Sequence, residues 1–472
     1  MVRPAIVWFR NDLRVSDHAA LSAAVAGGRP VVALYVHDDD VARQWAAGGA
    51  SRWWLHHSLE ALGASLHRRG APLILRRGAA AEHLAAIARE TDATEVHAGD
   101  AAEPWARAQE VRVAATLAGD GVAFHRHRTS MLFDQDRIRT QSGGPFQVYS
   151  PFARACMAGG GPPPPLAAPT RLTAPSRPPR SDRLENWTLL PTHPDWAAGL
   201  RATWIPGERA ARNRLARFLD GPIAGYAAGR DRPGEDATSR LSPHLRFGEL
   251  SPAEIWHGVR HAKGAGKFLG ELLWREFSRH LLWHQPDMPE KPLRPAFVAM
   301  DWRTDPGSLR AWQRGQTGIP IVDAGMRQLW HTGWMHNRVR MIAASFLVKH
   351  LLIDWREGAA WFWDTLVDAD LANNSASWQW VAGSGSDSAP FVRVFNPMLQ
   401  ARKFDPDGSY IRVHVPELAA LPAAYVAAPW EAPGEVLRDA DVVLGNTYPR
   451  PIVDLAVGRT RALAAHAGLA SA

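Results

Sequence analysis

Short apolar runs alternate with amphipathic stretches along the first 130 residues of the chain. The amphipathic stretches repeat their apolar residues at helical spacing, as in Ser51–Arg69, where we expect Ser51 at the N-cap and Gly70 just past the end. Strands separated by helices predict a doubly wound parallel sheet with right-handed crossovers. The predicted strands are Ala5–Phe9, Pro30–Val36, Pro72–Leu75, Thr94–Ala98 and Gly121–His125.

A different pattern follows this region. Residues 131–200 are predicted to be an interdomain linker, because they carry the run AGGGPPPPLAAP and further prolines that cannot pack as regular structure. From about Trp204 to about residue 400 the pattern is almost purely helical. We therefore expect an α/β domain over residues 1–130 and a large all-α domain over residues 201–472. The tail is short, without a long low-complexity extension.

Two helices of the second domain are predicted closely. The first begins at Pro320, ends at Gly333 and should bury one apolar stripe. The second should bury one face and present Asn337, Arg340 and Met341 on the other, which suggests the wall of a pocket. The residues expected to be buried are Val322, Met326, Leu329 and Trp330 in the first helix, and Val339, Ile342, Ala343 and Phe346 in the second.

Composition narrows the class of protein. With 472 residues and 46% hydrophobic residues, the chain is long enough to build more than one core. Its one cysteine, Cys156, excludes an intramolecular disulfide and fits a reducing compartment. Neither a signal-like N-terminus nor a long uncharged apolar run occurs, so we expect a cytoplasmic protein with no membrane partner. The net charge of +7 permits a polyanionic partner such as nucleic acid.

Tryptophan is unusually frequent, with 21 residues against 6 tyrosines. Most tryptophans in a protein pack in cores or interfaces. In a basic, aromatic-rich protein some of them can also stack on flat rings such as bases or a flavin. The 20 histidines are scattered without ligand-like spacing, so no metal site is expected.

Three segments bear on the chemistry. The loop after the first strand is Arg10–Arg14 (RNDLR) and lacks GxGxxG, which argues against an NAD-binding domain. Thr238–Ser242 (TSRLS) combines three hydroxyls and a guanidinium before a helix, which suits a pyrophosphate, although such clusters are usually helix caps. Asp368 and Asp370 need a cationic partner such as Arg340 if they are buried; a structural ion pair and a functional site both explain them.

Between residues 320 and 400 the chain reads PIVDAGMRQLWHTGWMHNRVRM, LLIDWREG, LVDADLANNSASWQW and FVRVFNP. This succession resembles the flavin domain of the DNA photolyase and cryptochrome family, most closely the class I cyclobutane pyrimidine dimer photolyases. The resemblance extends to IVWFRNDLR near the N-terminus and so covers essentially the whole chain. It implies an α/β domain that holds an antenna chromophore, followed by a helical, FAD-binding catalytic domain.

The resemblance also implies roles around FAD. The TSRLS segment is similar to the one that holds the FAD diphosphate, and the two acids would meet the polar edge of the isoalloxazine ring, with Arg340 paired to Asp368. Asn374 matches the position facing flavin N5, where a neutral amide can support a reduced flavin and plant cryptochromes have an acid. The implied cofactor-binding residues are Tyr226, Thr238, Ser239, Arg240, Leu241, Ser242, Trp274, Arg275, Asn337, Arg340, Asp368, Asp370 and Asn374.

Further matches concern electron transfer and DNA. Trp378, Trp355 and Trp302 match the triad that carries an electron from the surface to the excited oxidised flavin. Glu271, if protonated, and Asn337 would hydrogen-bond a flipped-out dimer as negative charge develops, so they and Asn374 are the expected catalytic residues. The residues expected at the lesion or the DNA phosphates are Arg230, Glu271, Trp274, Asn337, Arg338, Met341, Trp380, Arg393 and Lys403.

Two finer points concern lesion class and antenna. Related (6-4) photolyases use histidines at the turn that here reads His336-Asn337-Arg338; Asn337 followed by Met341 fits the cyclobutane-dimer type, and His336 is also explained as a capping or core residue. The segment Glu103–Arg107 (EPWAR) differs from the EVNER type of folate-binding relatives and is closer to the EPxxR pattern of deazaflavin-binding ones. A deazaflavin antenna is therefore favoured over folate, while another flavin or an empty site stays open.

The resulting expectation is a monomeric flavoprotein lyase for DNA repair. Reduced FAD, excited by blue or near-ultraviolet light directly or through the antenna, would donate one electron to a flipped-out cyclobutane dimer in UV-damaged DNA, and the electron would return after the ring opens. The first alternative is a cryptochrome-type photoreceptor that signals through a partner, against which Glu271, Met341, Asn374 and the short tail argue. The second is a non-catalytic DNA-binding module, which does not explain the FAD-type motifs.

Overall fold

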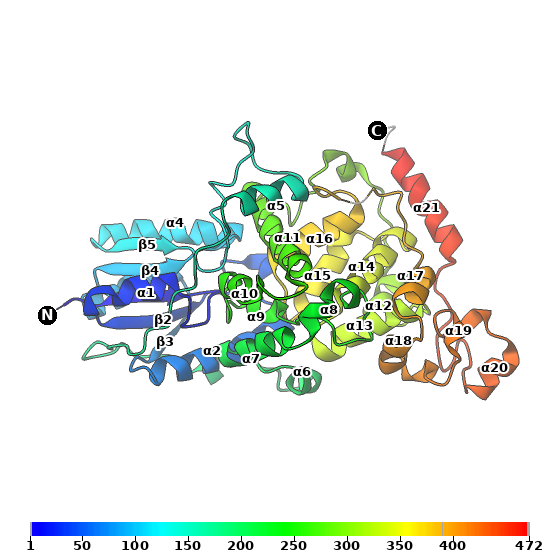
Figure 1. The fold of residues 1–472 in the computed structure, drawn as a ribbon, viewed down its shortest axis with the longest axis horizontal. Helices are drawn as coiled ribbons and strands as arrows, with labels where there is room; N and C mark the ends of the chain where they lie inside the picture. The colour runs from blue at the N-terminus through cyan, green and yellow to red at the C-terminus, as the bar shows by residue number, and fades with distance from the viewer. Residues whose placement is uncertain (1, 389, 470–472) are drawn as a thin grey trace. The chain divides into compact units, whose positions relative to one another are not determined.

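Figure 1 shows the computed structural model of the chain, which describes residues 2–388 and 390–469. The chain divides into two compact units. The first comprises Met1–Ala224, Ser239–Pro286 and Val367–Ala372; the second comprises Gly225–Thr238, Asp287–Leu366 and Asn373–Ala472. Because both units are discontinuous in sequence, the predicted division into residues 1–130, 131–200 and 201–472 stays a prediction.

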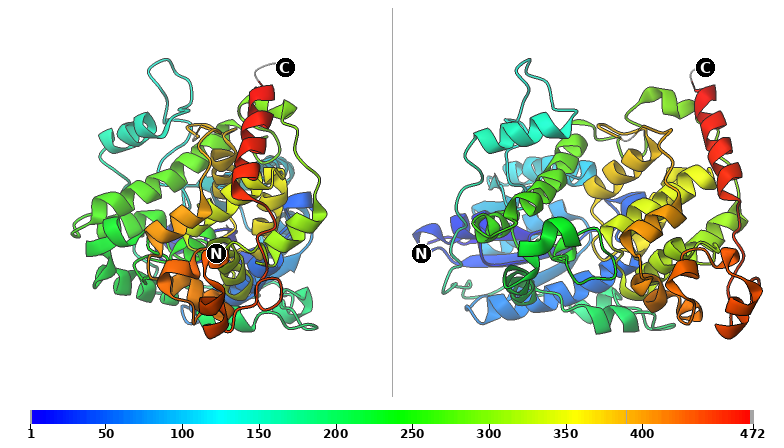
Figure 2. Two further views of the ribbon diagram at one scale, coloured as in Figure 1. Left: turned by 90° about the vertical axis from the view of Figure 1, so that its right-hand side faces the viewer. Right: turned by 45° about the vertical axis from the view of Figure 1, so that its right-hand side comes forward.

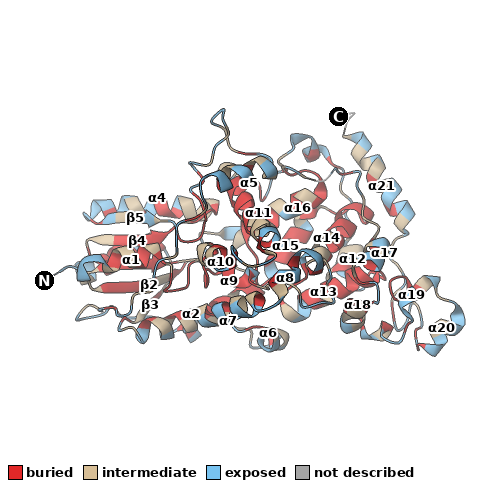
Figure 3. Cartoon of the chain, in the orientation of Figure 1, coloured by how far each residue is buried: buried red, intermediate tan, exposed pale blue. Residues whose placement is uncertain are grey.

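The first unit is built on the predicted parallel sheet. All five predicted strands form, and they pair in parallel in the order β3-β2-β1-β4-β5, as expected for a doubly wound fold. The strands are β1 (Ala5–Phe9), β2 (Val31–His37), β3 (Leu73–Arg77), β4 (Glu95–Gly99) and β5 (Ala123–His127). β1 is buried along its whole length, whereas most residues of the edge strand β5 are exposed (Figure 3).

Helices cover the sheet and supply its apolar core. The core joins strand residues such as Ile6 and Leu34 to helix residues such as Leu84, Val113 and Leu117. The helices of the α/β region are α1 (Ala19–Val25), α2 (Gly49–His67), α3 (Ala80–Thr91) and α4 (Pro104–Gly119). Burial of this alternating apolar pattern is the main driving force for the region.

The predicted start of α2 is wrong. The helix begins at Gly49 with Gly48 as N-cap, and the backbone N–H of Arg52 donates to Gly48 O at 2.9 Å. Ser51 therefore lies inside the helix, where its side chain is buried. The helix therefore begins two residues before Ser51, the residue that sequence alone favours as a cap.

Helices dominate from about Trp204 to about residue 400, as predicted. Helices also form in the stretch predicted to be a linker, where α5 lies and α6 begins, and they continue beyond residue 400. The remaining helices are α5 (Tyr149–Ala158), α6 (Ala198–Thr203), α7 (Glu208–Leu219), α8 (Pro222–Gly229), α9 (Ser242–Arg246), α10 (Pro252–Val259), α11 (Ala265–His284), α12 (Pro306–Gln313), α13 (Pro320–Thr332), α14 (Asn337–Ser345), α15 (Trp355–Thr365), α16 (Leu371–Ala382), α17 (Pro397–Phe404), α18 (Ser409–His414), α19 (Ala423–Val426), α20 (Gly434–Asp439) and α21 (Leu455–Gly468). Figure 2 shows these elements from two further sides, with α21 in red.

The two closely predicted helices form, with one correction. α13 runs from Pro320 to Gly333, which has a φ of 65° at the C-cap, and the expected face of α14 is buried. Trp330, expected in the buried stripe of α13, is 58% exposed. It stacks instead on Trp361, with ring centroids 5.8 Å apart. One aromatic face can be covered by a neighbouring helix without the ring entering the core.

Among the described residues, no helix combines the length and apolar composition that crossing a bilayer would need.

Candidate functional site

The TSRLS segment adopts a backbone shape that suits an anion. Arg240 has a left-handed φ of 49°, and Leu241, which follows it, lies in the right-handed helical region and is buried. Alternation of these two conformations turns successive backbone N–H groups to one side and forms an anion-binding concavity. Ser239 Oγ accepts from the N–H of Leu241 at 3.3 Å, and Ser242 is exposed at the start of α9. This arrangement suits the oxygens of an anion such as a phosphate.

One face of α11 presents two arginines to neighbouring segments of the first unit. Arg275 donates to the backbone oxygens of Ser130 (3.2 Å) and Leu245 (3.4 Å). Burial and the adjacent Arg279 lower the pKa of Arg275 to about 10, which leaves it charged at neutral pH. Arg279 donates to Ser130 and to Asp370 Oδ2, the latter at 2.9 Å. The helix thus joins the loop after β5 to the segment that carries the predicted acids.

The arginine found with Asp370 is Arg279, which the sequence did not single out. Both side chains are buried. Burial opposes the charge of Arg279, but the carboxylate of Asp370 outweighs it and raises the pKa of the guanidinium. Arg246 donates to Ala369 O and holds the same segment. Asp370 is therefore an anchored carboxylate, and Asp368, also buried, lies two residues away. The predicted pairing of Arg340 with Asp368 stays a prediction.

The same helix brings together two of the predicted lesion residues and one that was missed. Glu271 forms an ion pair with Lys267 at 3.2 Å, and its side chain is 27% exposed. Trp274, partly exposed, stacks face to face on Tyr149, with ring centroids 3.7 Å apart and planes 6° from parallel. Tyr149 OH donates to Gly270 O at 2.8 Å. One face of Trp274 is thus fixed by protein.

In the second unit, α14 begins with the predicted polar face. Asn337 is exposed, and its Nδ2 lies 4.0 Å from Met341 Sδ. Arg340 lies on the same face, where its Nε donates to Met335 O at 2.8 Å. His336 is the N-cap: its Nδ1 accepts from the N–H of Arg338 at 3.2 Å. Burial lowers the pKa of His336 to about 4, so the ring is neutral at pH 7. The capping explanation of His336 is confirmed.

Asn374 is held on α16 with its amide oriented. Its side chain is 8% exposed, and Nδ2 donates to Ala359 O of α15 at 3.0 Å. This bond uses one amide hydrogen and fixes the plane of the side chain. Trp380 is partly exposed on the same helix. Tyr226 is buried on α8, with the guanidinium of Arg230 5.6 Å from its ring centroid.

The three predicted electron-transfer tryptophans lie on connected elements of the second unit. Trp378 is buried against α15, where Gly358 makes the room: a Cβ at Gly358 would come within 2.1 Å of the indole. Trp355, also buried, begins α15. Trp302 is partly exposed, and the next residue, Arg303, donates from its backbone to Leu352 O at 2.8 Å, just before α15.

The four basic residues expected near DNA differ in their surroundings. Arg338 binds Asp231 through Nε (3.2 Å) and Nη2 (2.8 Å), and its guanidinium lies 4.4 Å from the ring of Phe404. Arg230 lies 3.9 Å from the same carboxylate. Arg393 and Lys403 are exposed. Asp231 offsets part of the positive charge of Arg338 and Arg230. Arg393 and Lys403 are therefore better suited to bind DNA phosphates.

Residues of the segment Glu103–Arg107, considered for the antenna chromophore, form hydrogen bonds with other parts of the protein. Glu103 is the residue before α4, and its Oε1 accepts from Asn11 Nδ2 at 3.3 Å. Arg107 donates to Trp283 O at 2.9 Å and lies 3.9 Å from the Trp283 ring centroid. These contacts do not distinguish a deazaflavin from a folate.

Comparison with known proteins covers the whole chain. A family model for the FAD binding domain of DNA photolyase matches residues 268–468, and one for DNA photolyase matches residues 5–170. A deoxyribodipyrimidine photo-lyase of Agrobacterium fabrum is 50% identical over 99% of this chain and 98% of its own length. The crystal structure of a bacterial class III photolyase from Agrobacterium tumefaciens superposes with a TM-score of 0.97 at 50% identity, over 100% of this chain and 98% of that one. Cryptochrome-1 of Arabidopsis thaliana is 35% identical over 97% of this chain and 69% of its own length.

A parallel α/β domain followed by a mostly helical FAD-binding domain is the class that the fold and these matches define. The chain belongs to the DNA photolyase and cryptochrome family. The expected likeness to class I in particular is corrected, because the structure with 50% identity is described as class III. The motifs on which that expectation rested do not separate class I from class III.

Two functional neighbours had no sequence signal of their own. Tyr149 lies far from Trp274 along the chain, in a stretch predicted to be linker, and Arg279 is one of many arginines. The helical spacing of Arg275 and Arg279 does indicate a shared face. Nothing in the sequence states which acid that face meets.

Proposed function

We propose that the chain is a deoxyribodipyrimidine photo-lyase that splits cyclobutane pyrimidine dimers in UV-damaged DNA with the energy of light. Family membership over the full length supports FAD-dependent, light-driven repair. The single local observation that supports lesion binding is the position of Trp274. This partly exposed ring stacks on Tyr149 and lies about one helical turn from Glu271. A fixed aromatic face is what an unstacked, flipped-out pyrimidine pair needs.

Bound FAD supplies the light absorption and the one-electron chemistry. We assign its diphosphate to the backbone concavity and hydroxyls of Thr238–Ser242, with Tyr226, Trp274 and Arg275 as further contacts. The ring edge is assigned to Asn337, Arg340, Asp368, Asp370 and Asn374. The buried Arg279–Asp370 pair supports this assignment, because it holds a carboxylate in place without leaving its charge uncompensated.

Lesion contacts are assigned to Glu271, Trp274, Asn337, Met341 and Trp380. Trp274 and Trp380 supply flat walls, and Asn337 and Glu271 supply hydrogen bonds to the pyrimidine carbonyls. The ion pair with Lys267 is an interaction of the ionised Glu271. We propose that a bound dimer displaces Lys267 from Glu271.

Electron transfer and DNA binding are the remaining roles in the proposal. Trp378, Trp355 and Trp302 form the route by which an electron reaches the flavin from the surface, in order from buried to partly exposed. The DNA phosphates are assigned to Arg393 and Lys403, which are exposed, and secondarily to Arg230 and Arg338. We also propose a second chromophore, and the EPWAR segment favours a deazaflavin over folate. The proposal further includes a monomeric state and a cytoplasmic location.

Light-dependent repair tests the function directly. Dithionite-reduced holoprotein is mixed with UV-irradiated DNA, and thymine dimers are counted after blue light, with dark and (6-4)-lesion controls. We expect loss of cyclobutane dimers only in light. Glu271→Gln should reduce repair by about tenfold or more while flavin stays bound, because the acidic O–H is replaced by an amide N–H, which is a weaker donor to developing negative charge. The matched variant Lys267→Gln, which removes only the ion-pair partner, should repair at a rate close to that of the wild type.

A cryptochrome-type photoreceptor is the second candidate, favoured by the 35% identity to Cryptochrome-1. The light-dependent repair assay also distinguishes the photolyase from the photoreceptor. If the flavin bleaches and recovers in light while every dimer survives, the enzyme proposal is rejected in favour of the photoreceptor. Repair with equal rates in the wild type and Glu271→Gln would keep the enzyme but reject the role given to Glu271.

A further inference from the structure

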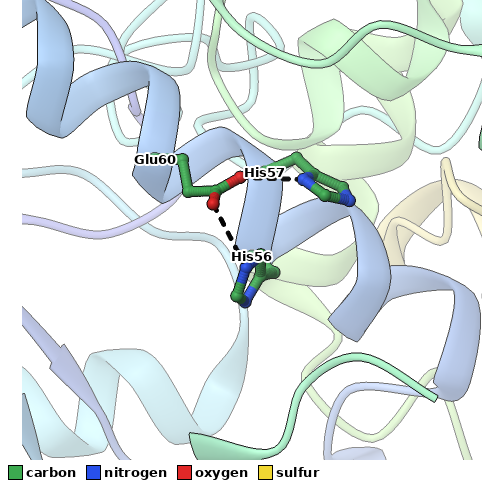
Figure 4. A group of neighbouring side chains, drawn as sticks. All are labelled: His56, His57 and Glu60. Carbon is green, nitrogen blue, oxygen red and sulfur yellow. Dashed lines mark hydrogen bonds and ion pairs between the residues drawn. The ribbon is translucent and has the colours of Figure 1, made fainter. Parts of the chain in front are cut away.

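Helix α2 carries two histidines and a glutamate that converge at one point, away from every residue assigned above (Figure 4). Glu60 lies between the two rings. Its Oε1 is 3.4 Å from His56 Nε2, and its Oε2 is 2.9 Å from His57 Nδ1. One ligand atom from each of the three side chains lies within 4.8 Å of the others. Atoms this close can reach a single cation at bond lengths of about 2.0–2.2 Å after small rotations.

The positions follow from helical geometry. Residues three and four apart lie on one face of a helix, so Glu60 reaches both His57 and His56. Trp53 packs edge-on against His57, with centroids 4.8 Å apart, and limits the orientations of that ring. Rigid backbone and a packed neighbour hold the donors near one another before any ligand arrives.

His56 is the buried member of the three donors. Its Nε2 faces Oε1 of Glu60, and within the described residues its second nitrogen, Nδ1, has no hydrogen-bond partner. A cation that enters between the imidazole and the carboxylate replaces the proton that these two groups share. An imidazole nitrogen that has lost its proton in this way is a metal ligand.

We propose that His56, His57 and Glu60 bind one divalent transition-metal cation of the zinc type through two imidazole nitrogens and one carboxylate. This mixture of nitrogen and oxygen donors suits zinc and its neighbours and is unsuited to magnesium or calcium, which take oxygen ligands. His57 is partly exposed and Glu60 is exposed, so the remaining coordination position is open to water. The proposal departs from the expectation of no metal site.

The consequence concerns the stability of α2. The three donors converge only when the helix is formed, so a bound cation stabilises the folded chain over the unfolded one. α2 also carries Trp54, whose Nε1 donates to Glu249 at 3.0 Å. A cation bound to this helix therefore secures an element that is also bonded to another segment of the first unit.

Zinc titration of the flavin-loaded protein tests the site. The metal is removed with a chelator, and ZnCl₂ is added in a competition assay with a chromophoric indicator. We expect one site in the wild type, weakened at least tenfold in Glu60→Gln and in His57→Gln. His67→Gln is the matched control, because His67 is an exposed histidine on the same helix outside the cluster. It should bind zinc like the wild type, and MgCl₂ should not compete.

The outcomes are distinct. Zinc should raise the Tm of the wild type and of His67→Gln but not that of Glu60→Gln. Equal zinc affinity in Glu60→Gln, His57→Gln and the wild type would place the metal at other histidines and overturn the proposal, as would the absence of a stoichiometric site. Circular dichroism and flavin content confirm that each variant is folded.

Discussion

At the scale of single residues, Trp274 shows how a binding face is prepared. Its stack on Tyr149 fixes one side of the indole, and Tyr149 is itself tied to Gly270. We predict that Tyr149→Ala weakens binding of a dimer-containing oligonucleotide about fivefold, because a stacked aromatic pair contributes about 1 kcal/mol. Fluorescence anisotropy measures the Kd. Tyr149→Phe, which keeps the stack and removes only the hydroxyl, should bind like the wild type; equal loss in both variants would contradict the role of the stack.

At the scale of elements, α15 and α16 approach one another at Gly358. A Cβ there would meet the Trp378 ring, so we predict that Gly358→Ala displaces the indole and costs about 1–3 kcal/mol, despite the higher helix propensity of alanine. Blue-light reduction of the bound flavin, followed by absorbance with an external reductant, should slow toward the rate of Trp378→Phe. Gly266→Ala on α11 is the control, because nothing lies within 4 Å of its added Cβ. An unchanged rate in Gly358→Ala would refute the prediction.

At the scale of the whole molecule, buried neutral histidines predict the response to acid. Burial lowers the pKa of His280 to about 3 and those of His127 and His350 to about 4. Between pH 6.5 and pH 4 these three histidines therefore bind more protons in the unfolded chain than in the folded one, and they lower the stability as the pH falls through this window. Asp323, whose pKa burial raises to about 6, acts in the opposite direction but is a single group. Tm measured across it should decrease, and His280→Gln should decrease less steeply. A constant wild-type Tm from pH 6.5 to pH 4 would contradict this.

The periodic elements were predictable from sequence because they depend on local spacing. All five strands and the ends of α13 follow apolar alternation, Pro320 and Gly333. The start of α2 and the exposure of Trp330 were predicted wrongly. Both depend on what packs against the helix, which the spacing of residues within one element does not contain.

The candidate site was also predictable only in part. The motifs identified the family, and the resemblance supplied the residues expected at FAD, in electron transfer and at the lesion, which stay predictions. The class within the family did not follow from these motifs, since the structure that is 50% identical is that of a class III photolyase. Tyr149 behind Trp274, Arg279 beside Asp370 and Gly358 beneath Trp378 appear only in three dimensions.

The sequence by itself thus determined the order of elements, the parallel sheet, the helical flavin region and the family. Each depends on periodicity or on short motifs that are contiguous in the chain. Tertiary structure alone decided which charge compensates Asp370, which ring supports Trp274 and how closely α15 meets α16. The physical reason is that partners distant in sequence are selected by the packing of whole elements, and such packing is a property of the complete fold.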